Sequence, residues 1–158
     1  MEFFDTNVLV YCHDAKIAAK QQRAQALLAN AICGSRLVVS TQVLLEFYNV
    51  VTAKKLRSPT EAETLCRLWA ESEVVTTTPG LLFRAFSLQQ RRQISIWDAL
   101  IVQAALDAGC RVLYTEDLQH GLRLGEMEII NPFLQPQAVH EPAALYRSGR
   151  RRRAPAKA

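Results

Sequence analysis

Short apolar runs alternate with longer segments of helical periodicity along most of this 158-residue chain. The first run, residues 2–11, is apolar and aromatic and is interrupted by one acid, Asp5. Such a run is typical of a buried strand in a parallel sheet, and we expect this strand to stop at Asp5. Four further strands are predicted, the last of them weaker, at residues 37–39, 74–77, 111–115 and 127–130.

Helices are predicted between these strands, and their ends carry capping signals. Gly34 is a C-cap, Ser58 begins a capping box that Glu61 completes, and Ser95 is an N-cap. The predicted helices cover residues 16–33, 42–55, 59–72, 79–92 and 96–108. Alternating strands and helices predict an α/β fold, a three-layer α/β/α sandwich around a parallel sheet of four to five strands.

Composition adds limits to this picture. A hydrophobic content of 49% and a charged content of 22% fit a soluble globular protein of one domain. No apolar run approaches the ~20 residues of a membrane span, and the first residues lack the basic head of a signal peptide. We therefore expect a cytoplasmic protein without a membrane partner. The four cysteines are dispersed, which favours reduced thiols in the core at Cys12, Cys33, Cys66 and Cys110.

Charge is divided unevenly between the body of the chain and its end. The formal net charge is +4, but six basic residues and no acid lie from Arg147 onward. Without these six, 13 basic residues remain against 15 acidic ones, so the body carries −2. Beyond Pro136 the sequence is rich in Pro, Ala and Arg and has no periodic apolar face. We therefore expect residues 1–135 to form the domain and residues 136–158 to be a disordered tail.

Two acids, Asp5 and Asp117, follow the first and fourth predicted strands. In open α/β sheets, ligands bind outside the carboxyl ends of the strands, so both acids are expected at that edge. Each also has a plainer interpretation. Asp5 could form an Asx turn or cap the next segment, and Asp117 could belong to a turn with Glu116 as its exposed neighbour.

Two more acids, Glu46 and Asp98, lie on predicted helices. Glu46 is at the edge of an apolar stripe that includes Val43 and Val50, so it faces partly inward. Its plainer interpretation is an ion pair with a nearby Lys or Arg. Asp98 is the acid in the first turn of a helix that is apolar almost all round. Ser95 and Asp98 resemble a capping box, a role that is compatible with a site.

Together, the four acids are expected at one end of one sheet. Unpaired carboxylates gathered there would repel one another and destabilise the fold, a cost that a divalent cation removes. Oxygen ligands without a nearby Cys or His select Mg²⁺ or Mn²⁺ rather than zinc. Since Mg²⁺ is held by one or two carboxylates plus substrate phosphate, the pattern predicts metal-assisted hydrolysis of a phosphodiester.

These motifs resemble those of the PIN-domain ribonucleases, and most of all the VapC-type toxins of bacterial toxin–antitoxin pairs. The triplet Asp5-Thr6-Asn7 resembles the family's opening D-T-N. The later motifs match in order and spacing, with Glu46 in a helix after the second strand, Asp98 in Ile96-Trp97-Asp98-Ala99-Leu100-Ile101 and Asp117 in Leu113-Tyr114-Thr115-Glu116-Asp117-Leu118. The similarity covers about residues 1–133.

The resemblance implies an endoribonuclease that cuts single-stranded or loop RNA with one or two Mg²⁺ or Mn²⁺ ions. Asp5 and Asp98 would be the principal metal ligands, and Glu46 and Asp117 would complete the site or orient the attacking water. The resemblance also implies a homodimer, and a small antitoxin protein that inhibits the enzyme by occupying the groove near the acids. It implies hydrogen-bonding support from Thr6, Asn7 and Thr115.

Seven arginines are weaker candidates for binding RNA, namely Arg84, Arg91, Arg92, Arg150, Arg151, Arg152 and Arg153. The first three lie, with Gln93, just before the Asp98 helix and could meet RNA phosphates or form a solvated helix end. The last four could tether RNA, since an acidic cleft needs cations to attract a polyanion. Alternatively, they belong to a solubilising or partner-binding tail.

Histidine and tryptophan add no chemistry to this hypothesis. The spacing of His13, His120 and His140 does not suit a catalytic base or a metal pair. Trp69 and Trp97 lie in apolar helical contexts, so we expect them in the core rather than as base-stacking platforms.

Two other functions fit parts of the sequence. A magnesium-dependent phosphatase of the haloacid dehalogenase type also begins with an acid after its first strand. That chemistry uses Asp-x-Asp, whereas Asn7 holds the second position here and no later lysine follows a suitable strand. The other alternative is a non-catalytic module that binds RNA or protein, in which the acids are structural.

Overall fold

The computed structural model describes residues 1–134, so the expected Arg-rich tail with its four consecutive arginines lies outside the described residues. The described chain forms β1 (Glu2–Phe4), α1 (Thr6–Tyr11), the 3₁₀ helix η1 (Ala15–Ile17), α2 (Ala18–Cys33), β2 (Leu37–Ser40), α3 (Thr41–Ala53), α4 (Pro59–Trp69), β3 (Glu73–Val75), α5 (Pro79–Arg92), α6 (Ile96–Asp107), β4 (Val112–Tyr114), β5 (Arg123–Leu124) and β6 (Met127–Ile130).

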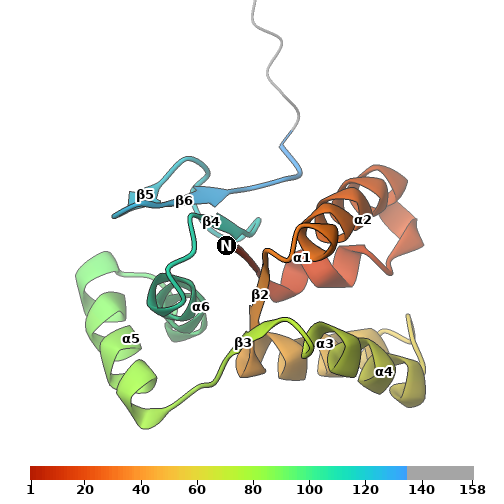
Figure 1. The fold of residues 1–158 in the computed structure, drawn as a ribbon, viewed down its shortest axis with the longest axis horizontal. Coiled ribbons are helices and arrows are strands. Elements are labelled where there is room, and N and C mark those ends of the chain that lie inside the picture. Colours follow the sequence, from red (N-terminus) through yellow and green to blue (C-terminus); the bar gives the residue numbers. More distant parts are fainter. Residues whose placement is uncertain (135–158) are drawn as a thin grey trace, which may run out of the picture.

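One mixed sheet organises these elements, with strand order β3-β2-β1-β4-β6-β5. Neighbouring strands pair in parallel from β3 to β6, and β5 alone pairs antiparallel, with β6. Figure 1 shows α5 and α6 on one side of the sheet and α1 to α4 on the other. The predicted α/β sandwich is therefore confirmed, with the five predicted strands forming its parallel part.

The short elements α1 and β5 were not predicted. The six-residue helix α1 begins directly after β1, because Asp5 adopts an extended backbone and its side chain accepts a hydrogen bond from the N–H of Thr6. Over only six residues, helical periodicity cannot be distinguished from a continuous apolar run. The two-residue strand β5 forms a hairpin with β6, in which Leu124 pairs with Met127 across a turn where Gly125 has φ +62°.

The core consists largely of the strands and the helix faces packed on them. The β1 residues Phe3 and Phe4 are fully buried, as is Leu113 of β4. Trp69 is buried as predicted, but the prediction for Trp97 is wrong, because 63% of it is exposed. Ile101 lies one turn later on the same face of α6 and is buried. Trp97 is therefore exposed because it lies in the first turn of the helix, and not because this face of α6 points to solvent.

All four cysteines are free thiols, in agreement with the prediction. Cys12 and Cys110 are buried and Cys66 is partly buried, but Cys33 is exposed at the end of α2, where we had expected a core position. Among residues 1–134, no helix combines the length and the apolar character needed to cross a membrane.

Candidate functional site

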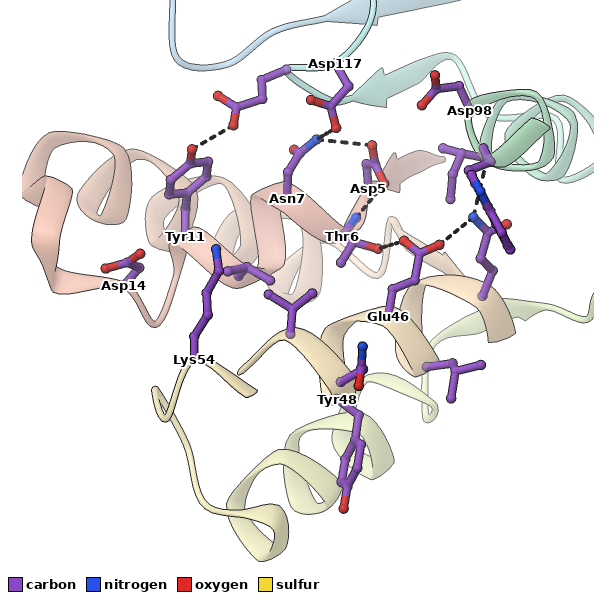
Figure 2. A pocket seen from close by; sticks show the side chains of 18 of the residues that line it. Asp5, Thr6, Asn7, Tyr11, Asp14, Glu46, Tyr48, Lys54, Asp98 and Asp117 are labelled. Carbon is purple, nitrogen blue, oxygen red and sulfur yellow. Dashed lines mark hydrogen bonds between the residues drawn. The ribbon is translucent and has the colours of Figure 1, made fainter. Parts of the chain in front are cut away.

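The four predicted acids line one pocket of about 1030 Å³ (Figure 2). They reach it from separate elements: Asp5 from the end of β1, Glu46 from α3, Asp98 from the first turn of α6 and Asp117 from the loop after β4. Since β1 and β4 are adjacent parallel strands, their carboxyl ends meet at the same edge of the sheet. The fold thus brings together carboxylates that lie up to 112 residues apart.

Asp5 is the most deeply buried of the four, with 7% of the residue exposed. Its Oδ1 accepts a hydrogen bond from the N–H of Thr6 (2.6 Å), and its Oδ2 accepts one from the hydroxyl of Thr115 (2.7 Å). Burial raises the pKa of Asp5 from 3.8 to about 6; the negative charges of Asp117 and Glu46 add to the rise, and these hydrogen bonds oppose it. Asp5 therefore caps α1 and also presents to the pocket a carboxylate that forms no ion pair with a Lys or Arg of the described chain.

The amide group of Asn7 joins the two strand-end acids. Its Nδ2 donates to Asp5 Oδ2 (3.2 Å), Asp117 Oδ2 (2.9 Å) and Thr115 Oγ1 (3.1 Å). Thr115 is fully buried and also accepts a hydrogen bond from the backbone N–H of Asp117 (3.1 Å). An amide carries two protons, so one Nδ2 group cannot fully satisfy three acceptors. The buried Oδ1 of Asn7 has no hydrogen-bond partner in the described part of the chain.

Glu46 is held by neighbours on two helices. Ser40 caps α3, which fixes the rotation of the helix that carries Glu46. Glu46 Oε2 accepts a hydrogen bond from the Thr6 hydroxyl (3.0 Å), and Oε1 accepts one from Gln42 Nε2 (2.8 Å). Glu46 faces partly inward, as predicted, and within residues 1–134 it forms no ion pair, which was the alternative interpretation.

Asp98 combines both roles that the sequence left open. Its backbone N–H donates to Ser95 Oγ (3.0 Å), and the Ser95 hydroxyl donates to Asp98 Oδ2 (2.7 Å). The helix is therefore capped by Ser95, and the same contact orients a carboxylate that lines the pocket. This carboxylate receives no hydrogen bond from the strand-end acids' network in the described structure.

The chemistry of the donors fits a hard divalent cation. All candidate ligands are oxygens, the buried Asp5 carboxylate has a raised pKa, and the Asn7 Oδ1 is an unused acceptor. No three His, Cys, Asp or Glu side chains of the described chain converge closely enough to hold a metal by themselves. A cation such as Mg²⁺, which takes one or two carboxylates and completes its shell with water and phosphate, is compatible with this spacing.

The prediction that Glu116 is the exposed neighbour of Asp117 is wrong, because Asp117 is exposed and Glu116 is partly buried. Glu116 accepts hydrogen bonds from the Tyr11 hydroxyl (2.7 Å) and from the ammonium group of Lys20. Lys20 also lies over the rings of Tyr11 and Phe133. These contacts attach the loop that carries Asp117 to α1 and α2, and nothing in the local sequence around residue 116 indicates them.

The predicted arginine contacts receive less support from the geometry. Arg84 pairs with Asp107 on α6, and neither Arg84, Arg91 nor Arg92 lines the acidic pocket. Among the described lining residues, Lys54 is the one Lys or Arg, against six carboxylates. The sequence analysis did not single out Lys54, which lies at the C-cap of α3. The four arginines from Arg150 to Arg153 are outside the described residues.

The family model of the PIN domain matches residues 3–121 of the chain. Among solved structures, the toxin VapC20 of Mycobacterium tuberculosis, described as cleaving the sarcin–ricin loop, has a TM-score of 0.60 at 21% identity, covering 74% of this chain and 92% of that one. A toxin–antitoxin complex from Klebsiella pneumoniae has a TM-score of 0.61 at 17% identity, covering 84% and 98%.

A third similar structure is VapBC2 from Rickettsia felis, bound to a DNA fragment from its promoter, with a TM-score of 0.53 at 16% identity, covering 81% and 96%. At these identities the similarity establishes the fold. No curated protein matches the chain.

Proposed function

The chain belongs to the PIN-domain family, and from this premise we propose that it is a metal-dependent endoribonuclease acting as the toxin of a toxin–antitoxin pair. The observation that carries the proposal is the pocket itself. The four predicted acids line it from four separate elements, and within residues 1–134 none of these four is paired with a Lys or Arg. An arrangement that is costly for an isolated protein is explained if a cation and a phosphodiester occupy it.

In the proposed reaction, Asp5 and Asp98 would hold Mg²⁺ or Mn²⁺, and Glu46 and Asp117 would complete the site or orient the attacking water. The bound cation would supply charge that activates water and stabilises the oxygens of the phosphorus centre and leaving group. The side chains of Thr6, Asn7 and Thr115 keep the carboxylates in place through the hydrogen bonds described above. Thr6 and Thr115 are buried and Asn7 is partly buried, which supports an arrangement that is organised before RNA arrives.

RNA phosphates need cations besides the metal, because the pocket wall is acidic. We propose Lys54 at the pocket and Arg91 and Arg92 at the end of α5 as phosphate contacts, and Arg150 to Arg153 as a tether. Arg84 is a poorer candidate, because it already pairs with Asp107.

Shortening the chain after Pro142 tests the tether. RNA binding should weaken, and its dependence on salt concentration should flatten, because fewer phosphates are neutralised. Unchanged salt dependence would leave Arg150 to Arg153 without a role in RNA binding.

Partners are part of the proposal. The Klebsiella structure is described as a toxin–antitoxin complex, which supports an antitoxin partner for this chain. We further propose a homodimer acting in the cytoplasm, where a toxin of this kind meets its RNA.

The proposal is tested by incubating the purified protein with total RNA under Mg²⁺, Mn²⁺ or EDTA and mapping the ends produced. Cleavage that needs a divalent cation and leaves 5′-phosphate ends supports attack by water at a metal site. Cleavage in EDTA, or 2′,3′-cyclic phosphate ends, contradicts it.

A paired variant separates an enzyme from a non-catalytic module. Asp5→Ala combined with Asp98→Asn should abolish cleavage and relieve growth arrest on expression, while circular dichroism shows a folded protein. A binding module would instead keep its RNA or protein partner and its effect on growth in this variant.

A further inference from the structure

Trp97 is a large aromatic side chain of the pocket to which the chemistry above gives no role. It precedes Asp98 in the first turn of α6 and lines the same pocket as the four acids. The residue is 63% exposed, whereas Trp69 is 2% exposed and packs on Phe47 with ring centroids 4.6 Å apart. Within residues 1–134, no aromatic ring or cation packs on the indole of Trp97.

The backbone of Trp97 is connected to the acids by a specific contact. Gln42 Nε2 donates to the carbonyl oxygen of Trp97 (3.4 Å) and to Glu46 Oε1 (2.8 Å). The Ser95 cap fixes the same helical turn through Asp98. These contacts hold the backbone of the first turn of α6, from which the indole of Trp97 projects, in a defined position relative to both Glu46 and Asp98.

The wall beside Asp98 is apolar, in contrast to the acids. Ile101 lies one turn after Trp97 on the same helix face, is buried and lines the pocket. A nucleotide has the same division, with an anionic phosphate at one end and a flat apolar base face at the other. Unpaired bases of single-stranded RNA stack on exposed aromatic side chains, whereas duplex bases are already stacked.

We propose that Trp97 is the stacking platform for the unpaired nucleobase next to the phosphodiester that would bind the cation held by the carboxylates. This inference rests on the proposed nuclease function and narrows its substrate to RNA whose base at that position is free to stack. Stacking accepts any base, so Trp97 contributes affinity for unpaired RNA and a preference for the larger purine faces rather than a fixed sequence.

Binding of short single-stranded oligoadenylate in Ca²⁺, with Trp97→Ala, Trp97→Phe and wild-type protein, tests the inference. Trp97→Ala should bind about tenfold more weakly, and Trp97→Phe should retain most of the affinity because it keeps an aromatic face. Tryptophan fluorescence of the wild type should be quenched by the RNA, and that quenching should be absent in Trp97→Phe. An oligomer with abasic residues should bind all three proteins with similar affinity.

Phe83→Leu provides the matched control. Phe83 is 65% exposed, similar to Trp97, but it lies on α5 outside the pocket, so this substitution should leave RNA binding unchanged. Equal loss in both variants would attribute the effect to exposed aromatic surface in general and overturn the inference.

The outcomes also separate this inference from the proposed function. If wild type and Trp97→Ala bind and cleave RNA equally, the stacking role is wrong and the nuclease stands. If Trp97→Ala changes the elution volume of the free protein but not RNA binding, Trp97 contacts protein instead, which also overturns the inference. If the wild type neither binds nor cleaves RNA, both proposals fail together.

Discussion

The pocket has a sheet side and a helix side, and they hold their carboxylates differently. The sheet side consists of Asp5, Asn7, Thr115 and Asp117, from the end of β1, the start of α1 and the end of β4. Its side chains bond directly to one another across 108 to 110 residues of sequence, with Thr115 fully buried and Asp5 almost so. Such a network is formed by the fold before any ligand binds.

The helix side consists of Glu46 and Asp98 with Trp97 and relies on more local contacts. Asp98 is held by Ser95 three residues earlier, and Glu46 by Gln42 four residues earlier and by Thr6. All these groups are at least partly open to solvent except Thr6. On the proposed function, we expect the sheet side to couple metal binding to stability, and we expect substitutions on the helix side to affect folding little.

The largest expected effect separates these two properties. Asp98→Asn and Asp5→Asn should each lower the rate of RNA cleavage by roughly 10³-fold or more, because each removes a proposed metal ligand. Asp98→Asn should leave the urea midpoint almost unchanged, since its backbone N–H still bonds to Ser95. Asp5→Asn should instead change how the free energy of unfolding depends on pH. If the Asp98→Asn protein cleaves RNA at the wild-type rate, Asp98 is not a metal ligand and the proposed role of the helix side is wrong.

The second prediction concerns pH and the sheet side. In EDTA, Asp5 should lower the free energy of unfolding by about 3 kcal/mol between about pH 4 and about pH 7. Its folded pKa is about 6 against an ordinary 3.8, so the folded state holds the proton more tightly. That stabilisation is present below the lower value and is lost as the pH rises through the higher one.

The difference between wild type and Asp5→Asn in urea unfolding isolates this contribution, because asparagine does not titrate. Saturating Mg²⁺ should reduce the loss in the wild type by compensating the buried charge. If the free energy of unfolding depends on pH in the same way in both proteins, the raised pKa of Asp5 is contradicted.

The third prediction concerns Asn7. Asn7→Ala removes the amide that joins Asp5 to Asp117, and we expect the Mn²⁺ concentration for half-maximal cleavage to rise about 10- to 100-fold. High Mn²⁺ should restore most of the rate. Gln42→Ala is the matched helix-side change, and because it removes one bond to Glu46 it should have a smaller effect. If both substitutions raise the Mn²⁺ requirement equally, the carboxylates of the sheet side and the helix side depend equally on their hydrogen-bond partners, which contradicts the comparison.

The smallest expected effect comes from Lys20→Met, outside the acids. The pair with Glu116 is partly exposed, so its loss should destabilise the fold by about 0.5–1 kcal/mol. Because Glu116 is adjacent to Asp117, the cleavage rate should fall a few-fold at low metal concentration. Lys16→Met is the control, since it removes an exposed lysine nearby that forms no ion pair within residues 1–134.

The sequence predicted the parallel sheet and the four acids because these depend on regular patterns. Alternation of strands and helices determines the architecture, and acids at strand ends or helix edges are visible without coordinates. Glu46 and Asp98 both line the pocket, and their positions on the helices could be counted in the sequence from Val43 and Ser95.

What the sequence did not reveal depends on partners that are distant along the chain. Asn7 contacts Asp117 across 110 residues, and Glu116 bonds to Lys20 across 96, so neither contact has a local signal. Trp97 was expected in the core because its helix is apolar almost all round. Its exposure depends on where the first turn of α6 lies relative to the pocket, which only the fold determines.

The central claim is that acids from both sides of the pocket jointly hold one kind of divalent cation. Titration of Mn²⁺ into the protein, followed by electron paramagnetic resonance of the free ion, tests this claim most directly. Wild-type protein, with short RNA present, should remove free Mn²⁺ from solution, and the variant with Asp5→Ala and Asp98→Asn should not. Equal Mn²⁺ binding by the two folded proteins would contradict the account.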